Sequence, residues 1–470
     1  MPSPPSAEAW GPERGPLGLE GLSRPERAIA ARTHLPGGPI ASRWTRGVCR
    51  PLAPGTAPWQ PGPGRRCPAR RTGTRGPGVL ISGAVALLLA GCSGPRRQDQ
   101  PAATAAGVPV AAVLALSGNG SAYGQDQRLG LRLALNGLNG AGGINGTPLT
   151  LQIEDGASDE ASAIAAFNLA IDRGSLALIG PTLSQQAFAA DPVAQRRGVP
   201  VLAPSNTATG IPQLGSFISR VSAQSSVIAP LAIDRALKLG PAIRRVAIFY
   251  AQDDAYSTAE TVIFQKALAD RGLKPVTVQR TQLADQDFQN QITATLRLRP
   301  DLVVLSLQAV DGGNLIRQLR ELGYRGTIVV GNGMNTPNIY PICQLHCDGI
   351  LIAQAYSPQL PTAANQALLR AFRAAQGAGS NPPQLTAQAY TALQVVAEAL
   401  RRVDRRRPLA STPLAEARRA LNAEILAGRY STPLGEIRFT PEGEVIQSAF
   451  FVARVRMEAD GRHGRFELLP

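Results

Sequence analysis

The sequence is poor in the residues on which most enzyme sites depend. It contains three histidines, at positions 34, 346 and 463, and none belongs to a His-Glu-x-x-His metal motif or accompanies a Gly-x-Ser-x-Gly nucleophile motif. Only five cysteines are present, and they show no paired zinc-binding spacing. We therefore expect no enzyme, no metal site and no cofactor.

Lysine is scarce as well, since Lys238, Lys266 and Lys274 are the only ones in the chain. The net charge of +15 therefore comes almost entirely from arginine, and much of this excess precedes residue 93. No stripe of basic residues with interleaved aromatics follows. This pattern indicates a genomic bias toward arginine, and we expect no nucleic-acid partner.

Residues 1–75 lack any sustained hydrophobic period and are rich in proline, glycine and arginine. Such a segment is not expected to pack into a core. Two explanations stay open, a start codon assigned too far upstream and a genuine disordered extension. An N-terminal peptide of the native protein would separate them.

Residues 76–92 have the pattern of an export signal. Arginines up to Arg75 precede the apolar run Val79–Ala90, which is too short for a membrane span, and Leu89-Ala90-Gly91-Cys92 ends the segment. These four residues resemble the bacterial lipobox, whose cysteine is lipidated. We expect a protein anchored to a bacterial membrane through Cys92, in the periplasm or at the cell surface, with residues 93–107 as a flexible tether.

From residue 108 onward, short apolar runs alternate with amphipathic helical patterns. The first strand is expected at Val108–Leu116 and the first helix at Gln125–Leu138, and the alternation continues to about residue 353. This order predicts an α/β fold with parallel sheets covered by helices on both faces. Long helices are expected afterwards at Ala363–Ala375, Leu385–Val403 and Pro413–Leu426, with closing strands at Glu436–Phe439 and Ala449–Val455.

The stretch 176–210 contains two turns in which a ligand site is expected. The run Leu176–Ile179 ends at Gly180-Pro181, and a second run, 200–202, ends in Ala203-Pro204-Ser205-Asn206-Thr207. Because the carboxyl ends of parallel strands meet at one edge of a sheet, the hydroxyls and free N–H groups of both turns can converge. The resulting crevice suits a small anion such as a carboxylate.

These turns, GPTLSQQAFA and VPVLAPSNTATGIP, resemble the ligand loops of the periplasmic leucine/isoleucine/valine-binding proteins, the substrate receptors of ABC importers. The resemblance runs from about Val108 to Met457, through LSGNGSAYGQDQRLGLRLALNGLNGAGGINGTPL, IFYAQDDAYS, GGNLIRQLRELGYRG and LGEIRFTPEGEV. It implies a type I periplasmic binding protein fold, with two Rossmann-like lobes joined by three crossover segments. We assign residues 108–224 and 355–430 to the first lobe and 225–354 and 431–470 to the second.

The resemblance also implies where the ligand carboxylate binds. Ser184 and Thr207 match the family's hydroxyl ligands, and the backbone at Gln185 and Asn206 would add N–H donors. Ser184 can equally cap the following helix and Thr207 a turn. The two roles are compatible.

Three more positions fall near the family's contacts with the ligand side chain. Tyr123 matches an aromatic after the first strand, and Tyr256 one in the second lobe, with Ala255 as the competing register. Gln308 takes a position that is often aromatic. Ordinary packing at loop edges is the alternative for all three.

The second lobe departs from the family where an α-ammonium is usually bound. The two acidic positions correspond here to Ser225 and to Asn332 or Gly333. A buried ammonium without a charged partner is costly. Either the ligand is not a standard amino acid, or another acid supplies the charge, the candidates being Asp253, Asp254 and Asp311.

Cys343 and Cys347 are the only cysteines after Cys92. Two cysteines four positions apart in an oxidising compartment are expected to form a disulfide. The alternative is a metal site with His346, for which no fourth ligand lies nearby in the sequence.

The glycines at 118, 120 and 124 also raise the possibility of a dinucleotide-binding enzyme. They read G-x-G-x-x-x-G, and the acidic pair Glu154-Asp155 lies about thirty residues beyond Gly124 instead of about twenty, so the spacing disfavours it.

The sequence instead predicts a monomeric solute receptor for an ABC importer. It would capture an amino acid or related small carboxylate by hinge closure, with the importer permease as partner. A lipoprotein of the same fold that reports a ligand to a membrane kinase, chemoreceptor or cell-wall enzyme is the alternative.

Overall fold

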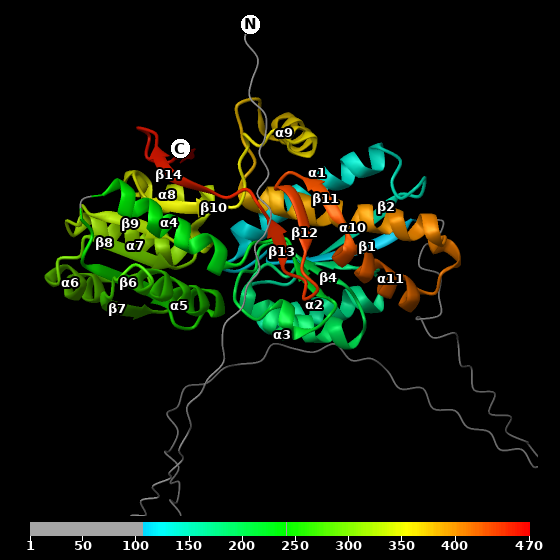
Figure 1. Cartoon of the computed structure of the whole chain (residues 1–470), viewed down its shortest axis with the longest axis horizontal. Helices are drawn as coiled ribbons and strands as arrows, with labels where there is room; N and C mark the ends of the chain where they lie inside the picture. The colour runs from blue at the N-terminus through cyan, green and yellow to red at the C-terminus, as the bar shows by residue number, and fades with distance from the viewer. Residues whose placement is uncertain (1–106, 241) are drawn as a thin grey trace, which may run out of the picture. The chain divides into compact units, whose positions relative to one another are not determined.

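The computed structural model describes residues 107–240 and 242–470, in which helices cover two mostly parallel sheets (Figure 1). The predicted α/β class is confirmed. The predicted export signal, Cys92 and the rest of residues 1–106 lie outside the described residues.

The first sheet has five strands in the order β2-β1-β3-β4-β5, and all neighbours are parallel. We call this sheet with its helices the first lobe. Its strands are β1 (Val108–Leu114), β2 (Leu149–Asp155), β3 (Leu178–Ile179), β4 (Val201–Ala203) and β5 (Ile218–Arg220).

Helices cover both faces of this sheet. On one face, buried residues of α1 (Ser121–Gly140), α10 (Gln384–Arg406) and α11 (Leu414–Ala427) share a hydrophobic cluster with β1. On the other face, α2 (Glu160–Asp172) and α3 (Ser184–Arg196) form a second cluster with the sheet (Figure 1). The long late helices therefore pack on the first sheet.

The second sheet has seven strands in the order β15-β14-β10-β9-β8-β6-β7, parallel from β7 to β10 and antiparallel at β14 and β15. We call this sheet with its helices the second lobe. Its strands are β6 (Val246–Ala251), β7 (Pro275–Thr281), β8 (Leu302–Ser306), β9 (Thr327–Val330), β10 (Leu351–Gln354), β14 (Phe451–Met457) and β15 (Gly464–Leu468).

Two helical layers enclose the second sheet as well. Buried residues of α4 (Ser225–Leu239) and α5 (Ala255–Ala269) pack on one face. Those of α6 (Gln289–Arg297), α7 (Ala309–Glu321) and the short α8 (Tyr340–Cys343) pack on the other. Burial on both faces explains why the inner strands β6, β8, β9 and β10 read as apolar runs in the sequence, whereas the edge strand β7 alternates.

A third, small sheet lies across the predicted lobe boundary at residue 431 and packs with the first lobe. Its strands are β11 (Arg429–Thr432), β12 (Gly435–Phe439) and β13 (Val445–Gln447). Tyr430, Ile437 and Phe439 join the hydrophobic cluster of the first lobe, because alternate residues of these strands point toward α11. The chain therefore reaches the second sheet only after Gln447, at β14.

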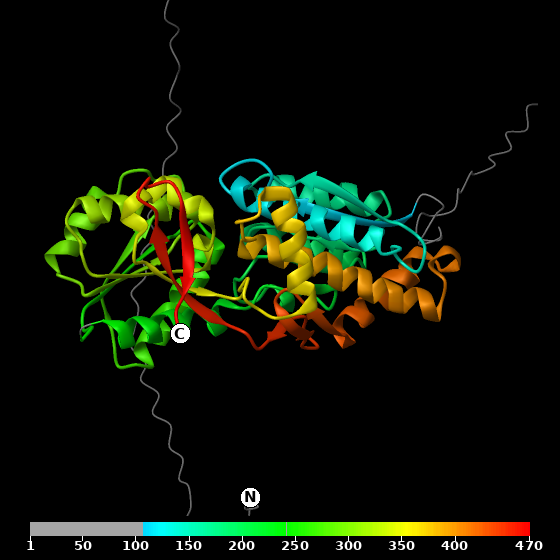
Figure 2. The same cartoon turned by 90° about the horizontal axis from the view of Figure 1, so that it is seen from above.

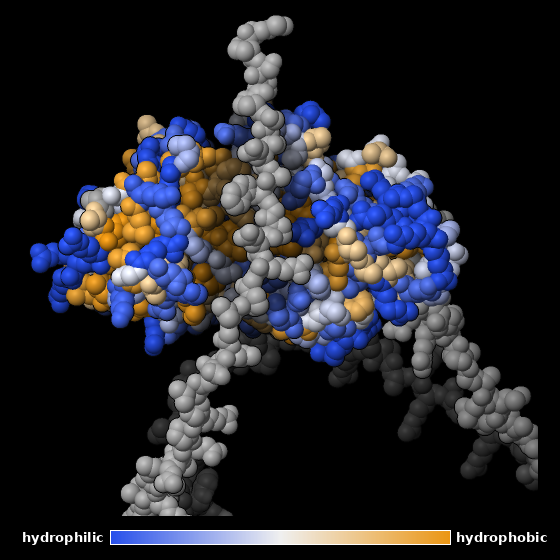
Figure 3. All heavy atoms as spheres, in the orientation of Figure 1, coloured by the Kyte–Doolittle hydropathy of each residue, from blue (hydrophilic) through white to orange (hydrophobic). Residues whose placement is uncertain are grey.

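Three segments connect the lobes: residues 221–224 before α4, residues 355–362 between β10 and α9 (Ala363–Gln376), and residues 448–450 before β14 (Figure 2). On the face shown in Figure 3, apolar side chains gather over the second lobe. Within the described residues, no helix has the length and apolar character needed to cross a membrane.

Asp191 is a carboxylate buried on α3 without a compensating partner. Neither of its oxygens has a hydrogen-bond partner among residues 107–240 and 242–470, and burial raises its pKa well above the usual range. Folding therefore favours the protonated form, so this group costs stability progressively as pH rises above the pKa of an unfolded Asp.

We expect Asp191→Asn to raise the thermal unfolding midpoint at pH 8 by roughly 3 °C or more, with a much smaller difference near pH 4. Unfolding scans at both pH values test this. Asp172→Asn is the control, since its exposed ion pair with Arg197 should contribute little. An equal difference at both pH values would contradict the assignment of the effect to ionisation.

Candidate ligand-binding site

A small cavity of about 50 Å³ lies between the carboxyl edges of the two sheets. Each lobe contributes residues that directly follow a strand, as expected for a crevice in an α/β protein. The lining residues are Tyr123, Thr182, Leu183, Ser184, Ser205, Asn206 and Thr207 of the first lobe, Leu385 of α10, and Tyr256, Gln308, Asn332 and Gly333 of the second lobe.

Ser184 is the first residue of α3, whose N-terminal end faces the cavity. Its hydroxyl accepts a hydrogen bond from Ala208 N (3.3 Å), so it links the turn after β3 to the turn after β4. Because the first N–H groups of a helix lack intrahelical acceptors, this end favours an anionic ligand. Ser184 and Thr207 are 2 % exposed, which strengthens any charge-assisted bond that they make.

A buried glutamine holds the same two turns together through hydrogen bonds. Gln127 of α1 donates to Ser205 Oγ (2.6 Å) and accepts from Thr182 Oγ1 (2.6 Å). Thr182 Oγ1 in turn accepts from Ala115 N (3.0 Å), at the end of β1. The first-lobe wall is thus held by the side chains of Gln127, Thr182 and Ser205 and by a backbone N–H at the end of β1.

The turn after β4 is also held by a buried ion pair that the sequence analysis missed. Arg220 donates to both carboxylate oxygens of Glu444 (2.8 Å each) and to the carbonyls of Asn206 (3.2 Å) and Ala208 (2.8 Å). Ser222 Oγ adds a bond to the Asn206 carbonyl (2.6 Å). The only sequence signal was an arginine at the end of an apolar strand.

The second-lobe wall contains a carboxylate that the sequence analysis also missed. Glu260 of α5 accepts from Asn332 N (3.1 Å), Ser225 Oγ (3.3 Å) and the Tyr256 hydroxyl. Burial raises its pKa to about 7. The resemblance placed acids at Ser225 and at Asn332 or Gly333, so a carboxyl group from another element lies between Ser225 and Asn332.

Glu260 lies one layer behind the cavity, because Tyr256 and Asn332 are the lining residues in front of it. A signal was present in the sequence, since Tyr256 and Glu260 are four positions apart and hence on one face of a helix.

The three acids considered from the sequence have other roles. Asp253 accepts from Leu283 N (3.0 Å) in an exposed loop. Asp254 caps α5 by accepting from Ser257 N (3.0 Å), and burial raises its pKa to about 6. Asp311 lies in the first turn of α7, where burial raises its pKa well above normal. None of the three lines the cavity.

Tyr123 connects the two lobes across the cavity. It comes from the first turn of α1, and its hydroxyl donates to Gly333 O (2.6 Å) and accepts from Ala309 N (2.6 Å) of the second lobe. Burial raises the pKa of this hydroxyl far above its usual value. Tyr123 thus contacts the opposite wall directly.

Seven of the nine predicted ligand-binding residues line this one cavity: Tyr123, Ser184, Asn206, Thr207, Tyr256, Gln308 and Asn332. Gln185 instead lines an adjoining crevice that shares Leu183 and Gln308 with the cavity. Ser225 is buried against Glu260. The lining residues that were not predicted are Thr182, Leu183, Ser205 and Leu385, whereas Gly333 was the alternative to Asn332.

Cys343 and Cys347 lie away from the cavity, buried in the hydrophobic cluster that packs α7 and α8 against the second sheet. Their Cα atoms are 5.5 Å apart, a separation within the range of disulfides. His346, the ligand required by the metal alternative, is partly exposed and lies 4.0 Å from a carboxylate oxygen of Glu321.

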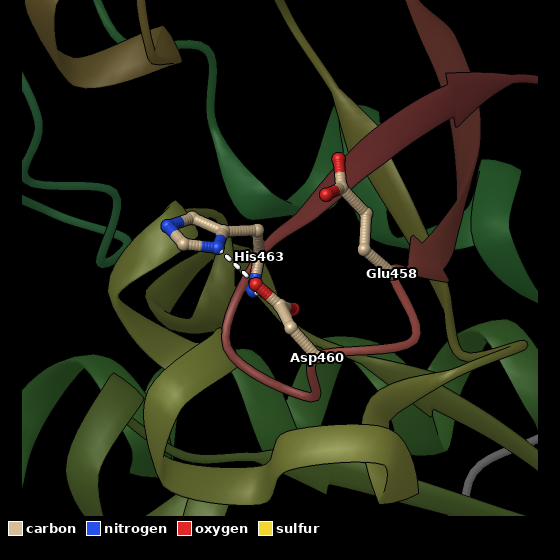
Figure 4. Close-up of side chains that lie close together, drawn as sticks. All are labelled: Glu458, Asp460 and His463. Carbon is tan, nitrogen blue, oxygen red and sulfur yellow. Dashed lines mark hydrogen bonds and ion pairs between the residues drawn. The ribbon is translucent and has the colours of Figure 1, made fainter.

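Figure 4 shows Glu458, Asp460 and His463 around the turn that joins β14 to β15. All three side chains are exposed. Asp460 accepts from the backbone N–H groups of Arg462 (2.9 Å) and His463 (3.0 Å), and its ion pair with His463 raises the pKa of the imidazole. These bonds stabilise the turn, and we assign the group no further role.

Two α/β lobes with a small cavity between facing strand ends have the architecture of a two-lobed solute-binding protein. The sequence profile of the periplasmic binding protein family matches residues 107–462, and the chain belongs to this family. It is a solute-binding protein and not an enzyme, and the predicted family resemblance is confirmed.

Among known proteins, the chain is 26 % identical over 333 residues to the leucine-, isoleucine-, valine-, threonine- and alanine-binding protein of Pseudomonas aeruginosa, covering 70 % of this chain and 85 % of that one. Two solved structures show the same fold. The branched-chain amino acid transporter substrate-binding protein LivJ of Streptococcus pneumoniae, in complex with isoleucine, is 21 % identical, with a TM-score of 0.67 over 77 % of this chain and 99 % of that one. An ABC transporter solute-binding protein of Rhodopseudomonas palustris, in complex with 3,4-dihydroxybenzoic acid, is 20 % identical, with a TM-score of 0.66 over 77 % and 96 %.

Proposed function

We propose that this protein is the extracytoplasmic receptor of an ABC importer and that it captures a small α-amino acid between its lobes. The observation that carries the proposal is the chemical difference between the two walls of the cavity. Its first-lobe wall presents Ser184, Thr207 and a helix N-terminus, which suit a carboxylate. Its second-lobe wall is backed by Glu260, which suits an ammonium group.

The relatives support the importer role but differ in whether the ligand carries an amine. The curated relative is named for five amino acids, and one of the two structures holds isoleucine, whereas the other holds an aromatic carboxylate without an amine. Glu260 favours the amine-bearing class for this chain, because a buried carboxylate gains from a nearby cation. Asn206 Oδ1 also favours an amine-bearing ligand, because this buried acceptor has no hydrogen-bond partner in the described part of the chain.

The proposal also includes the location of the protein, its partner and its covalent state. An importer receptor acts outside the cytoplasm, with the permease as its partner. Lipid anchoring at Cys92, a monomeric state and a Cys343–Cys347 disulfide belong to the same proposal, and the 5.5 Å Cα separation of the two cysteines supports the last of these.

Thermal unfolding against matched ligand pairs tests the ligand class. Leucine would be compared with 4-methylpentanoate, which lacks the amine, alongside isoleucine, threonine, benzoate, 3,4-dihydroxybenzoate and NAD. A ligand at a hundred times its Kd stabilises the folded state by about 2.7 kcal/mol. We expect a shift with at least one amino acid and none with its amine-free analogue. A shift with benzoates alone would contradict the amino-acid class, and a shift with NAD alone would overturn the function.

A further inference from the structure

A continuous chain of hydrogen bonds runs from Glu260 to the opposite lobe. The Tyr256 hydroxyl donates to Glu260 and accepts from Gly333 N (2.6 Å). The carbonyl oxygen of Gly333 in turn accepts from the Tyr123 hydroxyl of the first lobe (2.6 Å). Glu260 also accepts from Asn332 N (3.1 Å), so its carboxylate orients two consecutive peptide groups of the second lobe.

Two glycines allow this segment to lie against α5. A Cβ atom on Gly331 would stand 1.7 Å from Glu260 Oε2, and one on Gly333 would stand 2.7 Å from Tyr256 Cε1. Any side chain at either position would therefore displace Tyr256 or Glu260. The close approach indicates that residues 331–333 are shaped to these two side chains.

The Tyr123 hydroxyl also accepts a hydrogen bond from the N–H of Ala309, which has no acceptor within α7. Ala309 is the first residue of α7, and the first N–H groups of a helix have no intrahelical acceptor. Its N–H donates to the Tyr123 hydroxyl (2.6 Å), which belongs to the first lobe. Protection of the Ala309 N–H therefore depends on the contact between the lobes.

We infer that Glu260 is a positioning residue for lobe closure: its carboxylate holds the Tyr256 hydroxyl and the Asn332 N–H, and thereby presents the Gly333 carbonyl to Tyr123 of the other lobe. The inference rests on the proposed function only in taking closure of the two lobes as the event that traps the ligand. Glu260 does not itself line the cavity, so it acts through the lining residues Tyr256, Asn332 and Gly333.

Residue-resolved hydrogen exchange of the full-length chain, without ligand, tests the inference. In Glu260→Gln, one carboxylate oxygen becomes an NH₂ group that cannot accept, so we expect exchange at Asn332, Gly333 and Ala309 to accelerate by roughly tenfold or more. Tyr256→Phe keeps the carboxylate and should accelerate Gly333 and Ala309 but spare Asn332. Tyr123→Phe should accelerate Ala309 alone among the three N–H groups.

Two comparisons separate this role from general loosening of the fold. Asp253→Asn removes an exposed carboxylate from the same lobe and should leave all three N–H groups unchanged. Combining Tyr123→Phe with Glu260→Gln should accelerate Ala309 no further than Tyr123→Phe alone, because both changes break one chain of contacts.

The inference is overturned if Glu260→Gln and Tyr256→Phe accelerate Gly333 while Ala309 stays as protected as in the unchanged protein. It is equally overturned if Ala309 exchanges at the rate of an open chain before any substitution, since Tyr123 would then not close the lobes. The experiment contains no ligand, so failure of the proposed function would appear separately, in the unfolding scans.

Discussion

Ser184→Ala combined with Thr207→Ala weakens binding of a carboxylate ligand by roughly a thousandfold, while the ligand-free protein unfolds at nearly the same temperature. Each hydroxyl lines the cavity and is almost fully buried. A hydrogen bond to a charged group contributes about 1.5–3 kcal/mol, and two such bonds are lost together. Calorimetric titration with the ligand found in the unfolding scans measures the loss.

Ser226→Ala combined with Thr277→Ala is the control for this prediction, since both residues lie in the second lobe away from the cavity. Unchanged affinity in the Ser184/Thr207 variant would mean that the ligand carboxylate binds elsewhere. A large fall of the unfolding midpoint would instead assign these hydroxyls to capping α3 and the turn after β4, since Ser184 also accepts from Ala208 N (3.3 Å).

Arg220→Met destabilises the protein by about 3–5 kcal/mol, because it leaves Glu444 buried without its partner. The side chain of Arg220 is fully buried, and that of Glu444 is 8 % exposed. The carbonyls of Asn206 and Ala208 lose their donor as well. We expect the thermal midpoint to fall by roughly 10 °C, and unfolding scans in parallel with denaturant titration measure this.

Two further variants show what the ion pair does. Arg220→Met combined with Glu444→Leu removes both charges and should recover most of the lost stability. It should not recover ligand affinity, because the carbonyls of Asn206 and Ala208 in the turn after β4 then lack their arginine donor. Arg456→Met, which breaks the solvent-exposed ion pairs with Glu467 and Asp348, should change the stability very little. If Arg220→Met costs no more than Arg456→Met, the buried pair does not stabilise the turn after β4.

Several parts of the site were predictable because their signals are local. Gly180-Pro181 and the hydroxyl-rich turn at 203–207 end apolar runs, so parallel pairing alone brings Ser184, Asn206 and Thr207 to one edge. Gln185 was predicted as a backbone N–H donor to the ligand, and this stays a prediction. It is the second residue of α3, and it lines the adjoining crevice while Ser184 lines the cavity.

Other parts depend on contacts between distant segments. Glu260 was overlooked because the resemblance directed attention to positions 225 and 332, whereas the carboxylate reaches the space between them from α5. Arg220 and Glu444 are 224 positions apart, and Tyr123 and Gly333 are 210 apart. No period or short motif reports such pairs.

The sequence by itself determined the α/β class, the family and the two turns of the first-lobe wall, because hydrophobic period, strand ends and turn residues act within a few positions of the chain. The tertiary structure alone decided which acid stands behind the second-lobe wall, which ion pair holds the turn after β4, and that Tyr123 bridges the lobes. The physical reason is that burial changes what a polar group requires. Glu260, Arg220 and Tyr123 each find their partners only where folding removes water, and that place depends on how distant elements pack.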